Sequence, residues 1–276
     1  MSEPNNPDLA DSTPEQEESS VYAALERQLA EPVLRGQAGL DKAQVYMAAF
    51  LITMTGMLAY QGILQVHFIS PDRIFFFHKE GLSSLSTFTS AVSSRGPGPL
   101  ALLTIAATWW VKPSASAPHH AVSLVLHLAN SVMVYLLARR LRTSEQSQSE
   151  AVPMTAGMLF ALAPWNVEAV AMVTARSYLL AGFGCLLALI LFLRATDARR
   201  TAIGALSLTG ALAAFVIACL SHPLALLFPA VLTAVYWLYG RRRDGRRYWL
   251  AVALFWLVGM GGAGILELVG DHALMH

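Results

Sequence analysis

Two ionisable residues, Glu168 and Arg176, occur in a stretch of sequence that is otherwise apolar and helical in pattern. A charged side chain at bilayer depth costs at least ~3 kcal/mol on insertion scales, so such residues usually face a cavity lined by protein or water. In such a cavity a carboxylate can exchange a proton and a guanidinium can hold a phosphate. The two residues therefore predict either a functional polar site or a structural ion pair between two helices.

Several histidines can contribute to the same site. His119 and His120 begin an apolar run, and His127 follows His120 by two helical turns on the same face. His222 lies in a turn between two later apolar runs. Histidine and carboxylate are metal ligands by type, but this spacing matches no metal motif, and we expect no metal. The alternatives are hydrogen-bonding histidines at a membrane interface and a proton relay through Glu168 and His127.

The composition indicates the elements that must position these residues. With 55% hydrophobic and 13% charged residues, the 276-residue chain is too apolar for one soluble core. Runs of roughly 20 apolar residues predict membrane-spanning helices. We predict an all-α polytopic membrane protein with seven such helices, at Tyr46–Val66, His119–Leu141, Val152–Thr174, Tyr178–Leu193, Ala202–Leu220, Pro223–Tyr239 and Tyr248–Val269.

The apolar run Leu100–Val111 is too short to span, because it would rise only about 18 Å through a hydrocarbon layer of ~30 Å. It predicts a re-entrant or interfacial helix. Arginines concentrate after the second, fourth and sixth predicted helices, and the positive-inside rule makes those loops and the N-terminus cytoplasmic and the C-terminus external. The arginines at 241–247 could instead bind anionic lipid or nucleic acid. We expect no nucleic-acid partner.

This orientation brings the polar residues of the predicted helices to the external side, where an outward-facing cavity is the predicted site. The segments are an acidic disordered tail at 1–20, a cytoplasmic amphipathic helix and linker at 21–45, a transmembrane domain at 46–270 and an external tail at 271–276. Residues 67–118 form a long external loop, and such loops are usually functional. A partly ordered linker is the alternative for the amphipathic segment.

An ordered set of short motifs runs from the histidine-rich start at His119 onward. It continues through His127 and the segments Tyr135–Leu141, Leu159–Pro164, Val167–Ala171 and Ala175–Leu180. In order and type, this set resembles the membrane domain of GT-C class glycosyltransferases, especially protein O-mannosyltransferases that carry tetratricopeptide repeats. The resemblance implies a helical bundle with a long first external loop. It also implies an active site on the outer side that uses a polyprenyl-phosphate sugar.

Several positions depart from the pattern of that family. Its paired acidic residues should fall within Phe68–Ile74, where only Asp72 is acidic. Its Tyr-Arg-Pro-Leu element appears as Pro97-Gly98-Pro99-Leu100, the Asn of its His-x-x-Asn-x-x-x-His pattern is Ser123, and its Ser-Lys-Glu turn is Ser221-His222-Pro223. A transferase of this kind needs an acidic group to activate its acceptor and cationic groups to hold the lipid phosphate.

We therefore expect a noncatalytic GT-C-like subunit or scaffold of a larger membrane complex, in a bacterial inner membrane, that retains a lipid-binding cavity in the outer leaflet. The alternative is an active glycosyltransferase that uses a polyprenyl-phosphate sugar, with Asp72 as its base. In either case the cavity residues are His120, His127, Glu168, Arg176 and His222. The expected partners are membrane lipids and other membrane-protein subunits, contacted through the N-terminal segment and the bundle surface.

Overall fold

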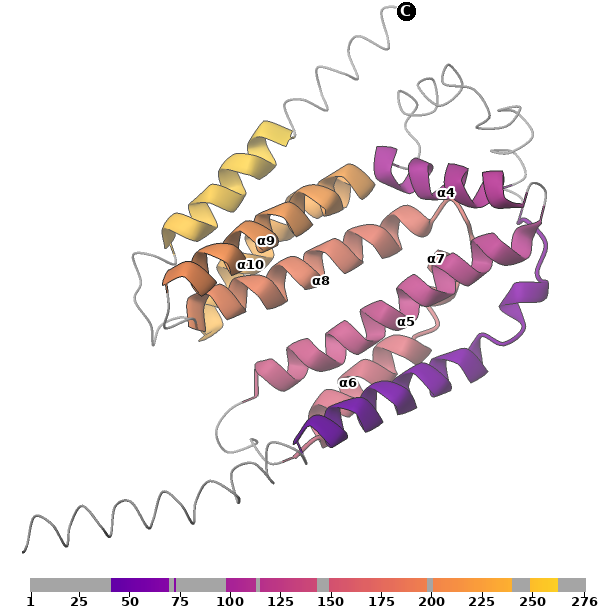
Figure 1. Ribbon diagram of the computed structural model, residues 1–276, viewed down its shortest axis with the longest axis horizontal. Coiled ribbons are helices and arrows are strands. Elements are labelled where there is room, and N and C mark those ends of the chain that lie inside the picture. The colour runs from indigo at the N-terminus through magenta and orange to yellow at the C-terminus, as the bar shows by residue number, and fades with distance from the viewer. Residues whose placement is uncertain are drawn as a thin grey trace, which may run out of the picture. The chain divides into compact units, whose positions relative to one another are not determined.

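The computed structural model describes residues 41–69, 72, 98–112, 115–142, 149–197, 201–239 and 249–262. The chain divides into two units after Ala48, and each is described by itself. The first unit contributes only residues 41–48, which are helical. The predicted acidic tail, the predicted amphipathic helix before residue 41 and the external tail at 271–276 lie outside the described residues. The described part is helical and contains no strand, which confirms the all-α class (Figure 1).

Three of the described helices are long and apolar enough to cross a membrane, which is compatible with an integral membrane protein. They are α5 (Ser116–Arg140), α8 (Arg176–Asp197) and α9 (Thr201–Ser221). Each coincides closely with one of the predicted spanning helices. The other predicted spans correspond to shorter apolar helices or, at residues 41–59, to a helix that continues into the short 3-10 turn η1 (Ile63–Gln65).

The predicted continuous helix Val152–Thr174 is wrong, because two short helices replace it. These are α6 (Ala151–Leu162) and α7 (Asn166–Ala171), and Ala163 between them is extended. Proline has no N–H to donate and disfavours helical geometry in the residue before it. Pro164 therefore ends α6, and the side chain of Asn166 donates to the Phe160 carbonyl (2.8 Å), which a helical residue 164 would otherwise serve.

The run Leu100–Val111 does form a short helix, α4 (Pro99–Val111), which begins with proline at its first position. The N–H of Gly98, just before α4, donates to the carbonyl of Ser221 at the end of α9 (3.1 Å). After α9 the chain makes a 3-10 turn, η3 (Pro223–Leu227), and continues as α10 (Phe228–Tyr239). α4 therefore lies across one end of the bundle, with its beginning at the end of α9 and its later residues at the beginnings of α5 and α8 (Figure 1).

Close helix packing supports this arrangement. A Cβ at Gly184 of α8 would lie 2.8 Å from the carbonyl oxygen of Ala214 and 2.8 Å from the Cβ of Ala218, so the backbones of α8 and α9 approach closely there. Beyond this contact, α8, α9, α10 and the helix Trp249–Gly262 share an apolar core that contains Phe192, Phe215, Phe228 and Phe255. On its other side α8 packs against α5, which also contacts α6 and α7.

Candidate functional site

Asp72 is fully buried, and its carboxylate accepts hydrogen bonds from the turn that precedes α8. One carboxylate oxygen accepts a hydrogen bond from the Val173 N–H (2.9 Å). The other accepts from the N–H and from the hydroxyl of Thr174 (both 2.9 Å). N–H groups near a helix start favour a negative charge, so Asp72 stabilises the turn from which α8 begins. Arg73, the next residue in the chain, lies outside the described residues.

Arg176 is the first residue of α8 and the largest fully buried side chain in the described part of the chain. Its guanidinium donates to the carbonyl oxygen of His119 (2.9 Å). It also donates to the hydroxyls of Thr108 (3.2 Å), Ser123 (3.4 Å) and Thr104 (3.5 Å). All four acceptors are neutral. We call these five residues, together with Asp72, the Arg176 cluster.

The two buried charges of this cluster balance each other without touching. The Asp72 carboxylate lies within electrostatic range of Arg176 and of His120, but its own hydrogen bonds go to residues 173 and 174. A buried charge is costly unless an opposite charge and hydrogen bonds compensate it. Here the turn between Val173 and Arg176 connects the two charges, and each charge has its own set of donors or acceptors.

Glu168 is exposed in α7 and is not the partner of Arg176 that its position in the sequence suggested. Among the described residues no hydrogen bond or ion pair joins the two side chains. The carboxylate that compensates Arg176 instead comes from Asp72, about a hundred residues earlier in the chain. The prediction is therefore corrected: the buried carboxylate that compensates the charge of Arg176 is that of Asp72, and the two groups are not in direct contact.

Thr108, near the end of α4, lies within hydrogen-bond distance of several groups. Its hydroxyl lies 2.7 Å from the carbonyl of Thr104 and 2.9 Å from that of Ile105. The same oxygen accepts a hydrogen bond from Arg176 (3.2 Å) and lies 3.0 Å from Nδ1 of His119, where the tautomer of the ring decides which group donates.

Sequence reasoning missed Thr104, Thr108 and Thr174, and it noted Ser123 only as a departure from a motif. A usable signal was present for two of them, because Thr104 and Thr108 are four residues apart and share one face of a short apolar helix. Thr174 carried no such signal, since its partner Asp72 is distant in sequence.

His120 lies near Asp72 and is fully buried. The carbonyl oxygens of Val66 and Val170 are beside its ring, yet within the described ranges neither ring nitrogen has a hydrogen-bond partner. The structure therefore brings together three of the predicted site residues, Asp72, His120 and Arg176.

His127 lies deeper along α5 and outside the Arg176 cluster. Its Nε2 is 3.0 Å from the carbonyl oxygen of Ala161, in the last turn of α6. Its ring packs against Tyr60 and Phe160, with centroid separations of 5.2 and 5.7 Å. Because α6 ends at Leu162, just before Pro164, the Ala161 carbonyl needs a hydrogen-bond donor from another element, and His127 supplies it.

His222 is also apart from the cluster, in the turn after α9. Its Nδ1 accepts a hydrogen bond from the N–H of Leu224 (3.1 Å) and so caps the start of η3. Its ring lies over that of Tyr178, with a centroid separation of 4.1 Å. Burial lowers the pKa of His222 below its ordinary value of 6.5, which keeps Nδ1 available as an acceptor at neutral pH.

A second polar group, which we call the Glu150 cluster, lies at the other end of α5. Glu150 accepts hydrogen bonds from the Tyr135 hydroxyl (2.9 Å) and from Nε of Arg139 (2.8 Å). It also forms an ion pair with Arg142 (3.3 Å). The burial of Glu150 acts to raise its pKa, but the hydrogen bonds from Arg139 and Tyr135 outweigh burial and lower it.

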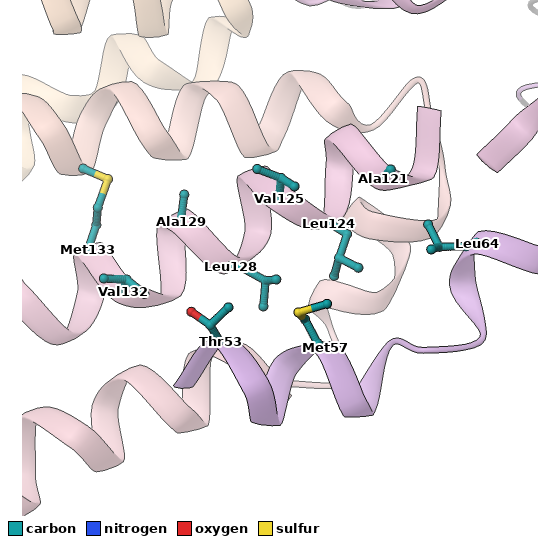
Figure 2. A pocket seen from close by; sticks show the side chains of 10 residues that line it. All are labelled: Thr53, Met57, Leu64, Ala121, Leu124, Val125, Leu128, Ala129, Val132 and Met133. Carbon is teal, nitrogen blue, oxygen red and sulfur yellow. The ribbon is translucent and has the colours of Figure 1, made fainter. Parts of the chain in front are cut away.

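An apolar groove runs along α5 (Figure 2). Its volume is about 650 Å³. Thr53 and Met57 of the preceding helix and Leu64 of η1 form its other wall. The lining residues are Thr53, Met57, Leu64, Ala121, Leu124, Val125, Leu128, Ala129, Val132 and Met133.

Neither a metal centre nor a known relative identifies the site. Over the described ranges, no group of three or more His, Cys, Asp or Glu side chains could hold a metal ion. No family model matches the chain, and no curated protein or solved structure matches it. The resemblance to GT-C glycosyltransferases therefore stays a prediction.

Proposed function

We propose that this chain is a noncatalytic integral membrane protein, a subunit or scaffold of a larger membrane assembly, that holds a lipid hydrocarbon chain along α5. The proposal depends on the hydrogen bonds of Asp72, the acidic residue that would be the base if the GT-C resemblance extended to catalysis. A general base must reach the proton of its substrate within ~3 Å. Asp72 is fully buried, and both of its oxygens already accept hydrogen bonds from the turn before α8.

Gly98 supports the same proposal, since it stands where the resembling family has an arginine. A Cβ at this position would overlap the carbonyl oxygen of Ser221, to which the Gly98 N–H donates. The packing of α4 on the end of α9 therefore leaves no space for a cationic side chain. Arg176 does not substitute for that cation, because it is fully buried among neutral acceptors.

The apolar groove supports the lipid part of the proposal (Figure 2). Three of its lining side chains are well exposed, Val125 at 65%, Met57 at 46% and Leu64 at 42%. Thr53 is the polar residue of the lining. Apolar surface of this extent is unfavourable in water. In a bilayer the groove instead accommodates an alkyl or isoprenoid chain.

A turnover assay tests the noncatalytic part. The full-length protein in mild detergent is incubated with a polyprenyl-phosphate sugar, and released polyprenyl phosphate is measured by mass spectrometry. Asp72→Asn is compared with Thr174→Val, which removes one hydrogen bond to the carboxylate but keeps the carboxylate itself. We expect no release from any form and a lower thermal midpoint for both variants. Release by wild type that Asp72→Asn abolishes and Thr174→Val retains would establish the transferase instead.

Native mass spectrometry of protein extracted from its own membrane tests the other two parts. We expect copurifying subunits and a bound lipid. Val125→Trp fills the groove and should remove the lipid, whereas Val216→Trp, at an exposed position of α9 outside the groove, should keep it. A lipid-free wild type, or equal lipid in both variants, contradicts binding in the groove. If the protein is always extracted without other proteins, the proposal that it is a subunit of a larger assembly is wrong.

A further inference from the structure

Two polar side chains on the buried face of α5 beyond the Arg176 cluster contact neighbouring helices, His127 and Asn130, which are 0% and 2% exposed. Each connects α5 to a different neighbour. His127 contacts the Ala161 carbonyl of α6 through Nε2 (3.0 Å), and Asn130 donates from Nδ2 to the Leu179 carbonyl of α8 (3.0 Å). The two residues therefore connect α5 to two different neighbouring helices.

These contacts determine whether the remaining polar atoms of the two side chains are donors or acceptors. A carbonyl oxygen only accepts hydrogen bonds, so Nε2 of His127 must carry the ring proton and Nδ1 must carry a lone pair. By the same reasoning the amide nitrogen of Asn130 faces Leu179, and Oδ1 points elsewhere. Both Nδ1 of His127 and Oδ1 of Asn130 are thus acceptors, and neither has a hydrogen-bond donor among the described residues.

The two acceptors belong to neighbouring positions. Residues three apart on a helix are neighbours on its surface, so one small molecule bound beside both side chains can reach both acceptors. Two acceptors cannot bond to each other. The adjacent hydroxyl of Ser131 does not serve them, because it donates to the His127 carbonyl of its own helix (2.8 Å). Buried polar atoms nearly always have a partner, and an internal water is the usual one where the protein supplies none.

We propose that one water molecule binds on the buried face of α5, donating one hydrogen to Nδ1 of His127 and the other to Oδ1 of Asn130. Water fits because it is small and has two hydrogens to donate. A lipid hydroxyl has only one and could satisfy only one of the two acceptors. His127 and Asn130 then hydrogen-bond to one backbone carbonyl of α6 and one of α8, and the bound water satisfies their remaining acceptor atoms.

Hydroxyl-radical footprinting by X-ray radiolysis of the full-length protein in detergent tests this site, since radicals form from water where it is bound. We expect oxidation of His127 to be several-fold faster than oxidation of Phe215. Phe215 is equally buried but lies in an apolar cluster. Equal rates at the two residues would overturn the proposal, and this measurement requires no variant.

Two variants sharpen the test. Asn130→Leu removes one of the two acceptors, and His127 oxidation should fall to the rate of Phe215. Ser131→Ala removes a buried hydroxyl on the next residue without touching either acceptor, and His127 oxidation should keep its wild-type rate. Unchanged oxidation of His127 in Asn130→Leu would overturn the bridging geometry.

Discussion

The two polar clusters at the ends of α5 compensate charge in opposite ways. In the Arg176 cluster both charges are fully buried and separated, and neutral groups of the chain hydrogen-bond to each of them. In the Glu150 cluster the charges touch, and the side chains of Arg139 and Glu150 are each 19% exposed.

Solvent explains this difference. Where water still reaches the side chains, a direct ion pair suffices and contributes little, because water competes with it. Where water is excluded, each hydrogen-bonding atom of a charged group needs its own partner, so the chain contributes hydroxyls and backbone groups from several elements. The Arg176 cluster should therefore be far more sensitive to the loss of a single partner than the Glu150 cluster.

The largest effect is expected for Arg176→Met. The variant keeps a long side chain but loses the positive charge and the hydrogen bonds to four acceptors, and it leaves Asp72 buried without compensation. We expect a loss of ~3–5 kcal/mol in the free energy of unfolding, measured by denaturant titration in micelles. Arg176→Lys should recover only part of it, because an ammonium lacks the planar fork of donors. Wild-type stability in Arg176→Met would mean that the cluster is hydrated.

Thr108→Val comes second. The substitution keeps the shape of the side chain but removes the oxygen that accepts from Arg176 and hydrogen-bonds with Nδ1 of His119. Leaving buried donors without a partner costs about 1–3 kcal/mol. Thr209→Val is the matched control, because Thr209 bonds only within its own helix and is exposed, and its effect should stay within about 0.5 kcal/mol. Equal effects at the two threonines would contradict the role of Thr108.

Tyr135→Phe removes a single hydroxyl from the Glu150 cluster and so parallels Thr108→Val. Glu150 keeps its contacts with Arg139 and Arg142 and remains partly hydrated. We expect a loss of about 1 kcal/mol in the same titration. A loss larger than that of Thr108→Val would reverse the comparison between the two clusters.

The smallest effect is the titration of Glu150 itself. Its pKa is lower in the folded chain than its ordinary value of 4.5, so its ionisation stabilises the fold above that pH, and the contribution disappears as the pH falls through the lowered pKa. We expect wild type to exceed Glu150→Gln by less than about 1 kcal/mol at neutral pH and low salt. The difference should vanish in acid and shrink in high salt, and a difference independent of pH would contradict this account.

The sequence predicted the features that depend on local composition. The all-α class and the helices α5, α8 and α9 follow from apolar runs, whose length can be read without knowing the fold. Arg176 was recognised because a charge in such a run is unusual. The break between α6 and α7 was missed as a boundary, although Pro164 is its direct cause.

Partners distant in sequence could not be predicted in the same way. Glu168 was chosen for Arg176 because it is the nearest carboxylate in the chain, but α7 directs it to the surface. The Asp72 carboxylate binds amides that are 101 and 102 residues away. Such pairing depends on how the elements fold back on one another, which no run of residues encodes locally.

In a membrane protein of the kind that we propose, the break at Pro164 also constrains how the chain is inserted during synthesis. α6 has 12 residues and rises about 18 Å, well short of a ~30 Å hydrocarbon layer. The carbonyl of Ala161 near its end receives a hydrogen bond from His127 of the preceding helix α5. In lipid an unpaired carbonyl is costly, so release of α6 alone from the translocon into the bilayer is unfavourable. α5 and α6 should leave the translocon together, as a helical hairpin.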